Sequence, residues 1–216
     1  MLDGNELKSL GISVLLILLN IALMGALSYT PASGLLGVLF AAPLVGIIVF
    51  GALLSGGNYL AERGLKRDDI GVALLGAAVL QFTYGIFGAG LLAGLAAGTQ
   101  LVLLGITAAV TAIIAVLAGA LVYGTDRDFS RWNMYAGGFF IGVLIFGAIG
   151  NFLWTPALLL AFLFALVGFT VYLVHEIWEM RSRPGKVYLN AVGIYVAYMG
   201  VFIQVLQIVM RLLSEE

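Results

Sequence analysis

The chain has 216 residues, of which 62% are hydrophobic and 10% are charged. Soluble domains carry roughly 25% charged residues, so this composition excludes an ordinary soluble fold and predicts an integral membrane protein. The net charge of −1 gives no basic face for nucleic-acid binding. The chain has no cysteine, which excludes disulfides, thiol nucleophiles and cysteine-based metal sites. The single histidine excludes metal or haem sites built from several histidines.

Apolar runs divide the chain into predicted spans. A membrane helix needs about 20 apolar residues, because the hydrocarbon core is roughly 30 Å thick. Runs of this length predict seven spans, at residues 10–29, 35–56, 70–95, 100–123, 132–154, 156–178 and 187–210. The longest connection, residues 56–69, is too short for a soluble domain. The sequence therefore predicts an all-α membrane protein with one seven-helix transmembrane domain over residues 1–216.

The boundary between the third and fourth spans rests on a Gly-rich segment. Residues 70–125 contain no charge, and only residues 94–100 interrupt the run. One helix of that length would be far longer than the membrane is thick, so we expect a break there. Small residues four apart, at Gly90, Gly94 and Gly98 and again at Gly138 and Gly142, predict close helix packing rather than a ligand-binding loop.

The basic residues predict the orientation. Cytoplasmic loops of membrane proteins carry an excess of Lys and Arg. Nine of the ten basic residues fall on one side of the seven-span scheme, and only Arg211 falls on the other. This partition predicts a multi-pass plasma-membrane protein with a cytoplasmic N-terminus. Residues 26–28 resemble a signal-peptide cleavage site, but Asp3 and Glu6 precede the first span, whereas signal peptides normally begin with positive charge.

Ionisable residues in or near a span occur only at the end of the sixth, at His175, Glu176 and Glu179. Intramembrane charge is costly, so such residues are candidates for function. Glu176 precedes Arg181 by five residues, or roughly 7.5 Å of helix, which places it near the cytoplasmic interface. For His175 and Glu179 we favour a polar helix end with local i,i+4 pairing, including Glu179 with Arg183. For Glu176 both interpretations stay open.

Other chemistry finds little support in the sequence. A retinal pump needs a lysine in the last span, which has none, and an intramembrane serine protease needs a deep His or Lys. The acidic loop at residues 125–128 is more typical of a solvated loop than of a metal site. We therefore predict no enzyme and no cofactor. Asn20, Gln81, Thr83, Asn151 and Gln204 are scattered polar groups that leave a small-molecule permease open.

The last third of the chain resembles a known family. "YLVHE" at residues 172–176 is similar to the end of the sixth helix of the Bax inhibitor-1 family, and "IYVAYMGVF" at residues 194–202 is similar to a pattern in its seventh helix. The resemblance implies six helices around a central seventh, and a pH-sensitive calcium leak channel or a regulator of other membrane proteins. It places Glu176 at the first of two aspartate positions. In the family these aspartates sense protons, because two close carboxylates cannot both ionise cheaply.

The second aspartate position is Ala197 here, and the family's asparagine position is Gly200. Glu176 is therefore expected to pair with Arg63 or His175 instead of with a second carboxylate. Two functions follow from the resemblance and stay open beside the permease. The first is a calcium or proton-gated cation leak with its gate near Glu176. The second is a non-conducting regulator that binds other membrane proteins in the lipid bilayer.

Overall fold

The computed structural model describes residues 2–30, 43–93 and 95–214, which form seven α-helices and no strand. This confirms the predicted all-helical class. Six of these helices, all except α3, are long and apolar enough to cross a membrane, as expected of a multi-pass membrane protein. The helices are α1 (Gly4–Ser28), α3 (Pro43–Lys66), α4 (Ile70–Leu92), α5 (Ala97–Gly124), α6 (Trp132–Phe152), α7 (Ala157–Ser182) and α8 (Val187–Ser214).

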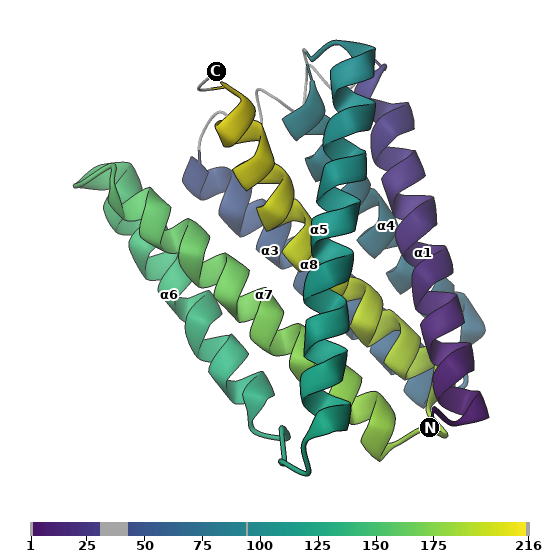
Figure 1. Cartoon of the computed structure of the whole chain (residues 1–216). Helices are drawn as coiled ribbons and strands as arrows, with labels where there is room; N and C mark the ends of the chain where they lie inside the picture. The colour runs from purple at the N-terminus through teal and green to yellow at the C-terminus, as the bar shows by residue number, and fades with distance from the viewer. Residues whose placement is uncertain (1, 31–42, 94, 215–216) are drawn as a thin grey trace.

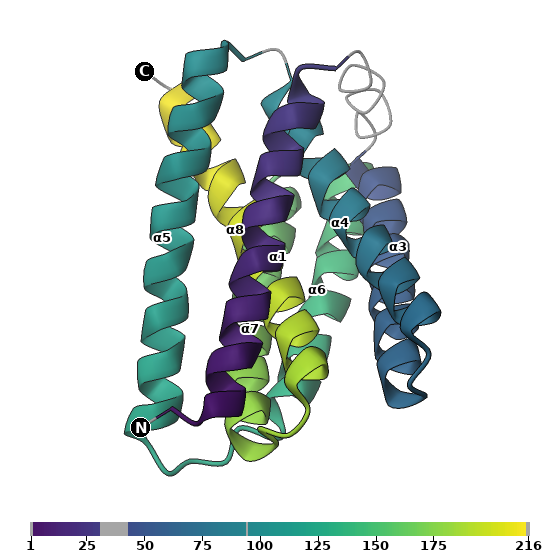
Figure 2. The same ribbon diagram turned by 90° about the vertical axis from the view of Figure 1, so that its right-hand side faces the viewer.

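One end of the bundle holds nearly all the positive charge. The N-terminus and the connections α3–α4, α5–α6 and α7–α8 lie at this end, and the C-terminus lies at the other (Figures 1 and 2). Nine of the ten Lys and Arg residues belong to these connections or to the helix turns beside them. We call it the basic end.

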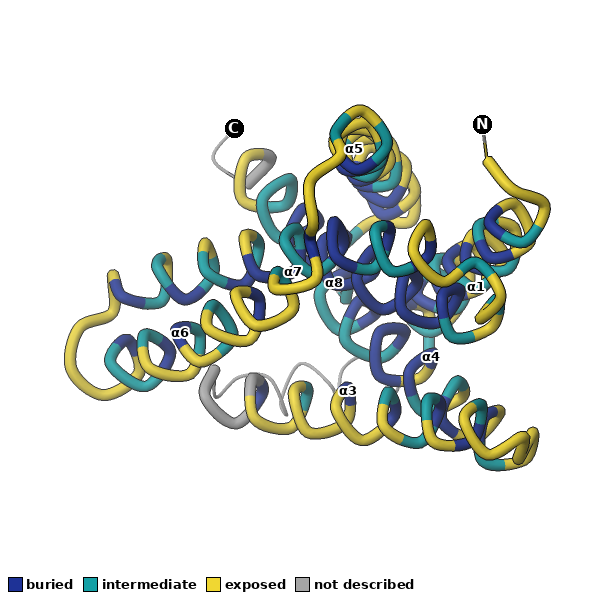
Figure 3. The backbone as a smooth tube through the Cα atoms, turned by 90° about the horizontal axis from the view of Figure 1, so that it is seen from below, coloured by how far each residue is buried: buried dark blue, intermediate teal, exposed yellow. Residues whose placement is uncertain are grey.

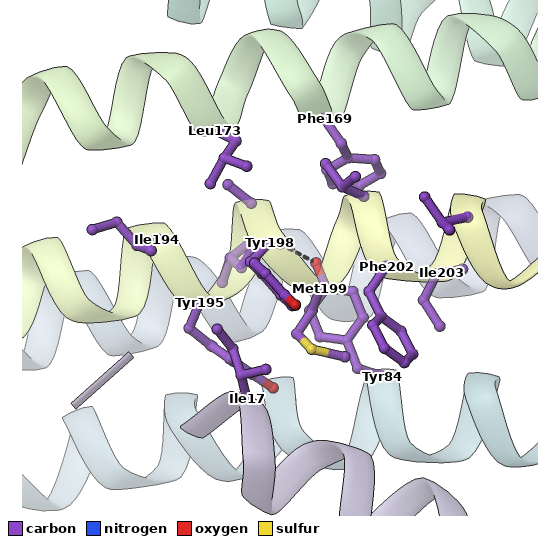
Figure 4. Packing of buried hydrophobic residues seen from close by; sticks show 14 of the residues in the cluster. Ile17, Tyr84, Phe169, Leu173, Ile194, Tyr195, Tyr198, Met199, Phe202 and Ile203 are labelled. Carbon is purple, nitrogen blue, oxygen red and sulfur yellow. Dashed lines mark hydrogen bonds between the residues drawn. The ribbon is translucent and has the colours of Figure 1, made fainter. Parts of the chain in front are cut away.

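The last helix, α8, lies at the centre of the bundle. It contacts α1, α3, α4, α5 and α7, and Figure 3 shows it enclosed by other helices. Of the residues in its most apolar stretch, 78% are buried, against 22–33% in the corresponding stretches of the other membrane-crossing helices. Tyr195 and Phe202 point toward α1 and α4, while Phe169 of α7 packs from the opposite side (Figure 4). A helix enclosed on all sides has to be apolar on all sides, as α8 largely is.

The second predicted span continues beyond its predicted C-terminal end. Helix α3 continues to Lys66, so the predicted connection 56–69 is wrong and only 67–69 join α3 to α4. Polar i,i+4 contacts support the extra turns, since Glu62 accepts from Asn58 Nδ2 at 2.9 Å and from Lys66 Nζ at 2.6 Å. Asp69 then caps α4 by accepting from Val72 N. The predicted start of the span, residues 35–42, lies outside the described residues.

The predicted break between the third and fourth spans is confirmed. Helix α4 ends at Leu92 and α5 begins at Ala97. The carbonyls at a helix C-terminus lack helical partners, and here Gln100 supplies them. Its Nε2 donates to Leu92 O at 3.2 Å and to Leu95 O at 2.9 Å, while its Oε1 accepts from Ser28 Oγ at 2.6 Å. A buried glutamine thus ties the α4–α5 connection to α1.

The predicted glycine pairs are confirmed only in part as packing positions. A side chain at Gly142 would overlap Phe164 of α7, so this glycine admits a close aromatic neighbour. Side chains at Gly98 and Gly138 would meet no atom within 4 Å, and Gly94 lies outside the described residues. Close backbone contact occurs instead between α3 and α4, at Gly64 and Gly76.

Candidate functional site

A cavity of about 930 Å³ lies between α3, α6, α7 and α8, with two residues of α4 at its side. Its lining on α7 runs from Leu158 to Tyr172, or roughly 21 Å of helix, so it covers much of the roughly 30 Å depth of a membrane. The lining is polar at the basic end and at the opposite end, and mostly apolar between them. The polar residues are Asn58, Glu62, Asn133 and Tyr172 at the basic end, Gln204, Gln207 and Arg211 at the other, and Ser55 on α3 between them.

Glu176 lies beside the basic end of this cavity. It is half-buried on α7, and its carboxylate lies against Gly193 of α8, where an added side chain would overlap it. The Tyr172 hydroxyl, one turn earlier on α7, is within hydrogen-bonding reach of the carboxylate. The absence of a side chain at Gly193 therefore gives the long Glu176 side chain room between α7 and α8.

A second carboxylate, Glu62, is close enough to Glu176 to act on it electrostatically. It comes from α3 and lines the cavity. Sequence reasoning missed Glu62 because the residue fell in a predicted connection rather than on a helix. The i,i+4 spacing of Asn58, Glu62 and Lys66 was the signal that predicts a continued helix with Glu62 on it. Glu179, the other charge acting on Glu176, forms the predicted ion pair with Arg183.

His175 faces away from Glu176 and anchors the α5–α6 connection. Its Nδ1 lies 3.1 Å from Phe129 O, and its ring stacks on Trp178 with centroids 6.0 Å apart. Arg181, further along α7, donates to Val122 O and Thr125 O at the end of α5. A cation at a helix C-terminus is favourable, so both side chains hold this connection against α7.

Arg63 lies apart from Glu176. Its side chain is exposed, donates to Tyr59 Oη at 2.5 Å and lies over that ring at 5.6 Å. Among the ion pairs between described residues, none joins Glu176 to Arg63 or His175. The expected pairing of Glu176 with Arg63 or His175 is therefore absent among the described residues. Arg63 binds Tyr59 instead, and His175 binds the Phe129 carbonyl.

Ala197, which occupies the second aspartate position of the Bax inhibitor-1 pattern, packs in the interior of the bundle. Ala197 is fully buried, and a side chain at Gly200 would overlap the Phe169 ring. Tyr195, by contrast, enters a polar cluster. Asn20 Nδ2 donates to Gln81 Oε1 at 2.7 Å and to Tyr195 Oη at 3.0 Å. Two of the polar residues that seemed scattered in the sequence thus meet between α1, α4 and α8.

The acidic connection before α6 has the features of a solvated loop. Asp128 is exposed, and its carboxylate accepts from Ser130 N at 2.8 Å, which lowers the pKa of Asp128. Within residues 2–30, 43–93 and 95–214, no group of three or more His, Asp or Glu side chains is placed to hold a metal ion.

Replacing His175 by phenylalanine is expected to destabilise the protein by about 1 kcal/mol, because the Phe129 carbonyl loses its side-chain partner. Thermal unfolding in detergent measures this loss. Arg63→Gln is the control, since its exposed side chain should change stability by no more than about 0.5 kcal/mol. Unfolding at the wild-type temperature would show that His175 does not anchor the connection.

Comparison with known proteins identifies no relative, since no family model, no curated protein and no solved structure matches the chain.

Proposed function

We propose that the chain is a cation leak channel of the Bax inhibitor-1 type, with Glu62 and Glu176 at the cytoplasmic mouth of its path. The observation that carries this proposal is the presence of two carboxylates near the basic end of the cavity, Glu62 of α3 in its lining and Glu176 of α7 beside it and within electrostatic range. Acidic side chains at a pore mouth raise the local concentration of cations and disfavour anions.

In the proposal, the cavity forms the path for ions, and its apolar middle keeps that path closed. Polar side chains line both ends, whereas the middle is formed by apolar residues such as Phe50, Phe140 and Phe169. Hydrophobic constrictions of this kind close a pore to ions by excluding water. A small outward movement of α3 from α6 and α7 would widen this region, because all three helices line it.

The orientation and the resemblance support the same assignment. The positive-inside rule favours a cytoplasmic basic end for the proposed plasma-membrane channel. In the Bax inhibitor-1 family two aspartates form the proton-sensing pair, and here Ala197 occupies the second position. Glu62 supplies a carboxylate from a different helix, so proton sensing by two acidic groups is retained in the proposal.

Liposomes with a trapped calcium dye test this function. We expect wild-type protein to pass Ca²⁺, and Glu62→Gln or Glu176→Gln to lower the initial rate by about tenfold, since a charged mouth concentrates counter-ions at least that much. Glu179→Gln is the control, because Glu179 is ion-paired with Arg183 and does not line the cavity, whereas Glu62 lines it although it is paired with Lys66. Wild-type flux equal to that of empty vesicles would refute conduction.

The pH dependence of the same flux tests proton sensing. If Glu176 carries part of the response, Glu176→Gln should flatten the pH profile, whereas Glu179→Gln should leave its shape unchanged. A full pH response in both Glu176→Gln and Glu62→Gln would contradict proton sensing at this mouth.

A non-conducting regulator is the second candidate, because the apolar middle of the cavity and the buried Ala197 remove polar groups from the path. Crosslinking in native membranes distinguishes it from the channel. A reproducible partner together with no Ca²⁺ flux would favour the regulator.

A further inference from the structure

The membrane-deep cavity opens sideways, toward the lipid. Figure 3 shows α3 standing apart from α6 and α7, and residues of all three helices line the cavity between them. Ile48 of α3 and Leu144 of α6 belong to the lining and are 53% and 49% exposed. Both are apolar, so the opening between them is suited to a hydrocarbon chain rather than to water.

The inner wall of this cavity carries one polar group without a partner. Gln204, on the central helix α8, lines the cavity and is only 7% exposed. Its Oε1 is buried and accepts no hydrogen bond from any residue that the structure describes. A buried carbonyl oxygen is costly unless a donor reaches it, and a molecule in the cavity is placed to bring one.

The depth of Gln204 restricts what that molecule is. Gln204 precedes Arg211 by seven residues, or roughly 10 Å of helix, so it lies well inside the apolar layer. A charged headgroup is costly at that depth, whereas a neutral hydroxyl is less so and can donate to the amide oxygen. The lining near Gln204 on α7, including Phe162, Ala165 and Phe169, is apolar, whereas Gln207 and Arg211 line the cavity further toward the C-terminus of α8.

We propose that this cavity binds a neutral membrane lipid with a free hydroxyl group and a hydrocarbon chain. The lipid enters between α3 and α6, donates its hydroxyl proton to Gln204 Oε1, and lays its chain along the phenylalanines of α3, α6 and α7. The cavity volume of about 930 Å³ falls within the roughly 300–1,000 Å³ of small-molecule sites. Binding of this kind does not depend on ion conduction.

Photolabelling of the purified full-length chain in phosphatidylcholine nanodiscs tests the proposal. The probes are a diazirine-bearing long-chain alcohol, its methyl ether and the corresponding fatty acid, and mass spectrometry locates the labels. We expect the alcohol to label cavity residues several-fold more than the ether, because the ether has no proton to donate. Gln204→Leu should reduce alcohol labelling to the ether level.

Two variants separate this site from general effects on the fold. Thr107→Val removes another buried hydroxyl without a partner, on α5 and outside the cavity lining, and should leave labelling unchanged. Ala165→Phe fills the cavity and should abolish labelling by alcohol and ether alike; size-exclusion chromatography checks that each variant is folded.

The proposal would be overturned by equal labelling by alcohol and ether in the wild type, by unchanged alcohol labelling in Gln204→Leu, or by labels confined to helix surfaces outside the cavity. Preferential labelling by the fatty acid would also overturn it, in favour of an anionic headgroup.

Discussion

Replacing Gly76 by valine is expected to separate α3 from α4 and to destabilise the protein by about 3 kcal/mol or more, at the upper end of the cost of overpacking. A side chain at Gly76 would place its first carbon 2.7 Å from both Ala61 Cα and Gly57 O. Carbon atoms in contact prefer about 3.5–4.0 Å. Because the clash is with backbone, no side-chain rotation relieves it.

The same contact recurs two turns along α3, which is why the effect of valine should be large. A side chain at Gly64 would lie 2.7 Å from Ala73 Cα and 2.8 Å from Asp69 O. Small residues bring membrane helices this close when lipid offers no hydrophobic drive for association. Separation at Gly76 would therefore also weaken the contact at Gly64 and displace α3, which forms one wall of the cavity.

Thermal unfolding in detergent measures this loss, with Gly105→Val as the control. Gly105 lies inside α5, two turns from its start, and has open space around its α-carbon, so the same substitution should change stability only through local helix propensity. Equal unfolding temperatures for the two variants would show that the α3–α4 contact does not limit stability.

Close packing by glycine was predictable as a principle, but its position was not. The sequence favoured Gly90, Gly94 and Gly98 because they lie four residues apart in an apolar run. Gly57 and Gly64 fell in the predicted connection 56–69, so the sequence did not identify them as helix-packing positions. Which face of a helix meets a partner is a property of the bundle, and near-uniform apolar sequences give little periodicity from which to read it.

Some residues of the candidate site could be predicted from the sequence, and others could not. Glu176 could be found from the sequence, because charge near an apolar span is costly and therefore conspicuous. Glu62 could not, because charge in a supposed loop is ordinary. The cavity and Gln204 required the structure, since a single glutamine in α8 gives no sign of whether it meets a neighbour or an opening between helices.

Replacing Asn20 by leucine is expected to destabilise the protein by about 2 kcal/mol. Asn20 is fully buried on α1, and its Nδ2 group reaches Gln81 O at 2.9 Å as well as Gln81 Oε1 and Tyr195 Oη. Leucine would leave Gln81 Oε1 and the Tyr195 hydroxyl without this donor, in an apolar interior where each unpaired group costs about 1–3 kcal/mol. Measured hydrogen bonds in membrane proteins average about 0.6 kcal/mol. We therefore expect each of the two unpaired groups to cost near the lower end of its range, which gives the total of about 2 kcal/mol.

A double-mutant cycle attributes the loss to the polar cluster. Tyr195→Phe removes one contact and should cost about 1 kcal/mol, and the double variant should lose less than the sum, because both changes break the same bond. Thr83→Val is the control, since Thr83 bonds only to Val79 O on its own helix. If Asn20→Leu unfolds no earlier than Thr83→Val, the cluster contributes no net stability to the packing of α1 against α4 and α8.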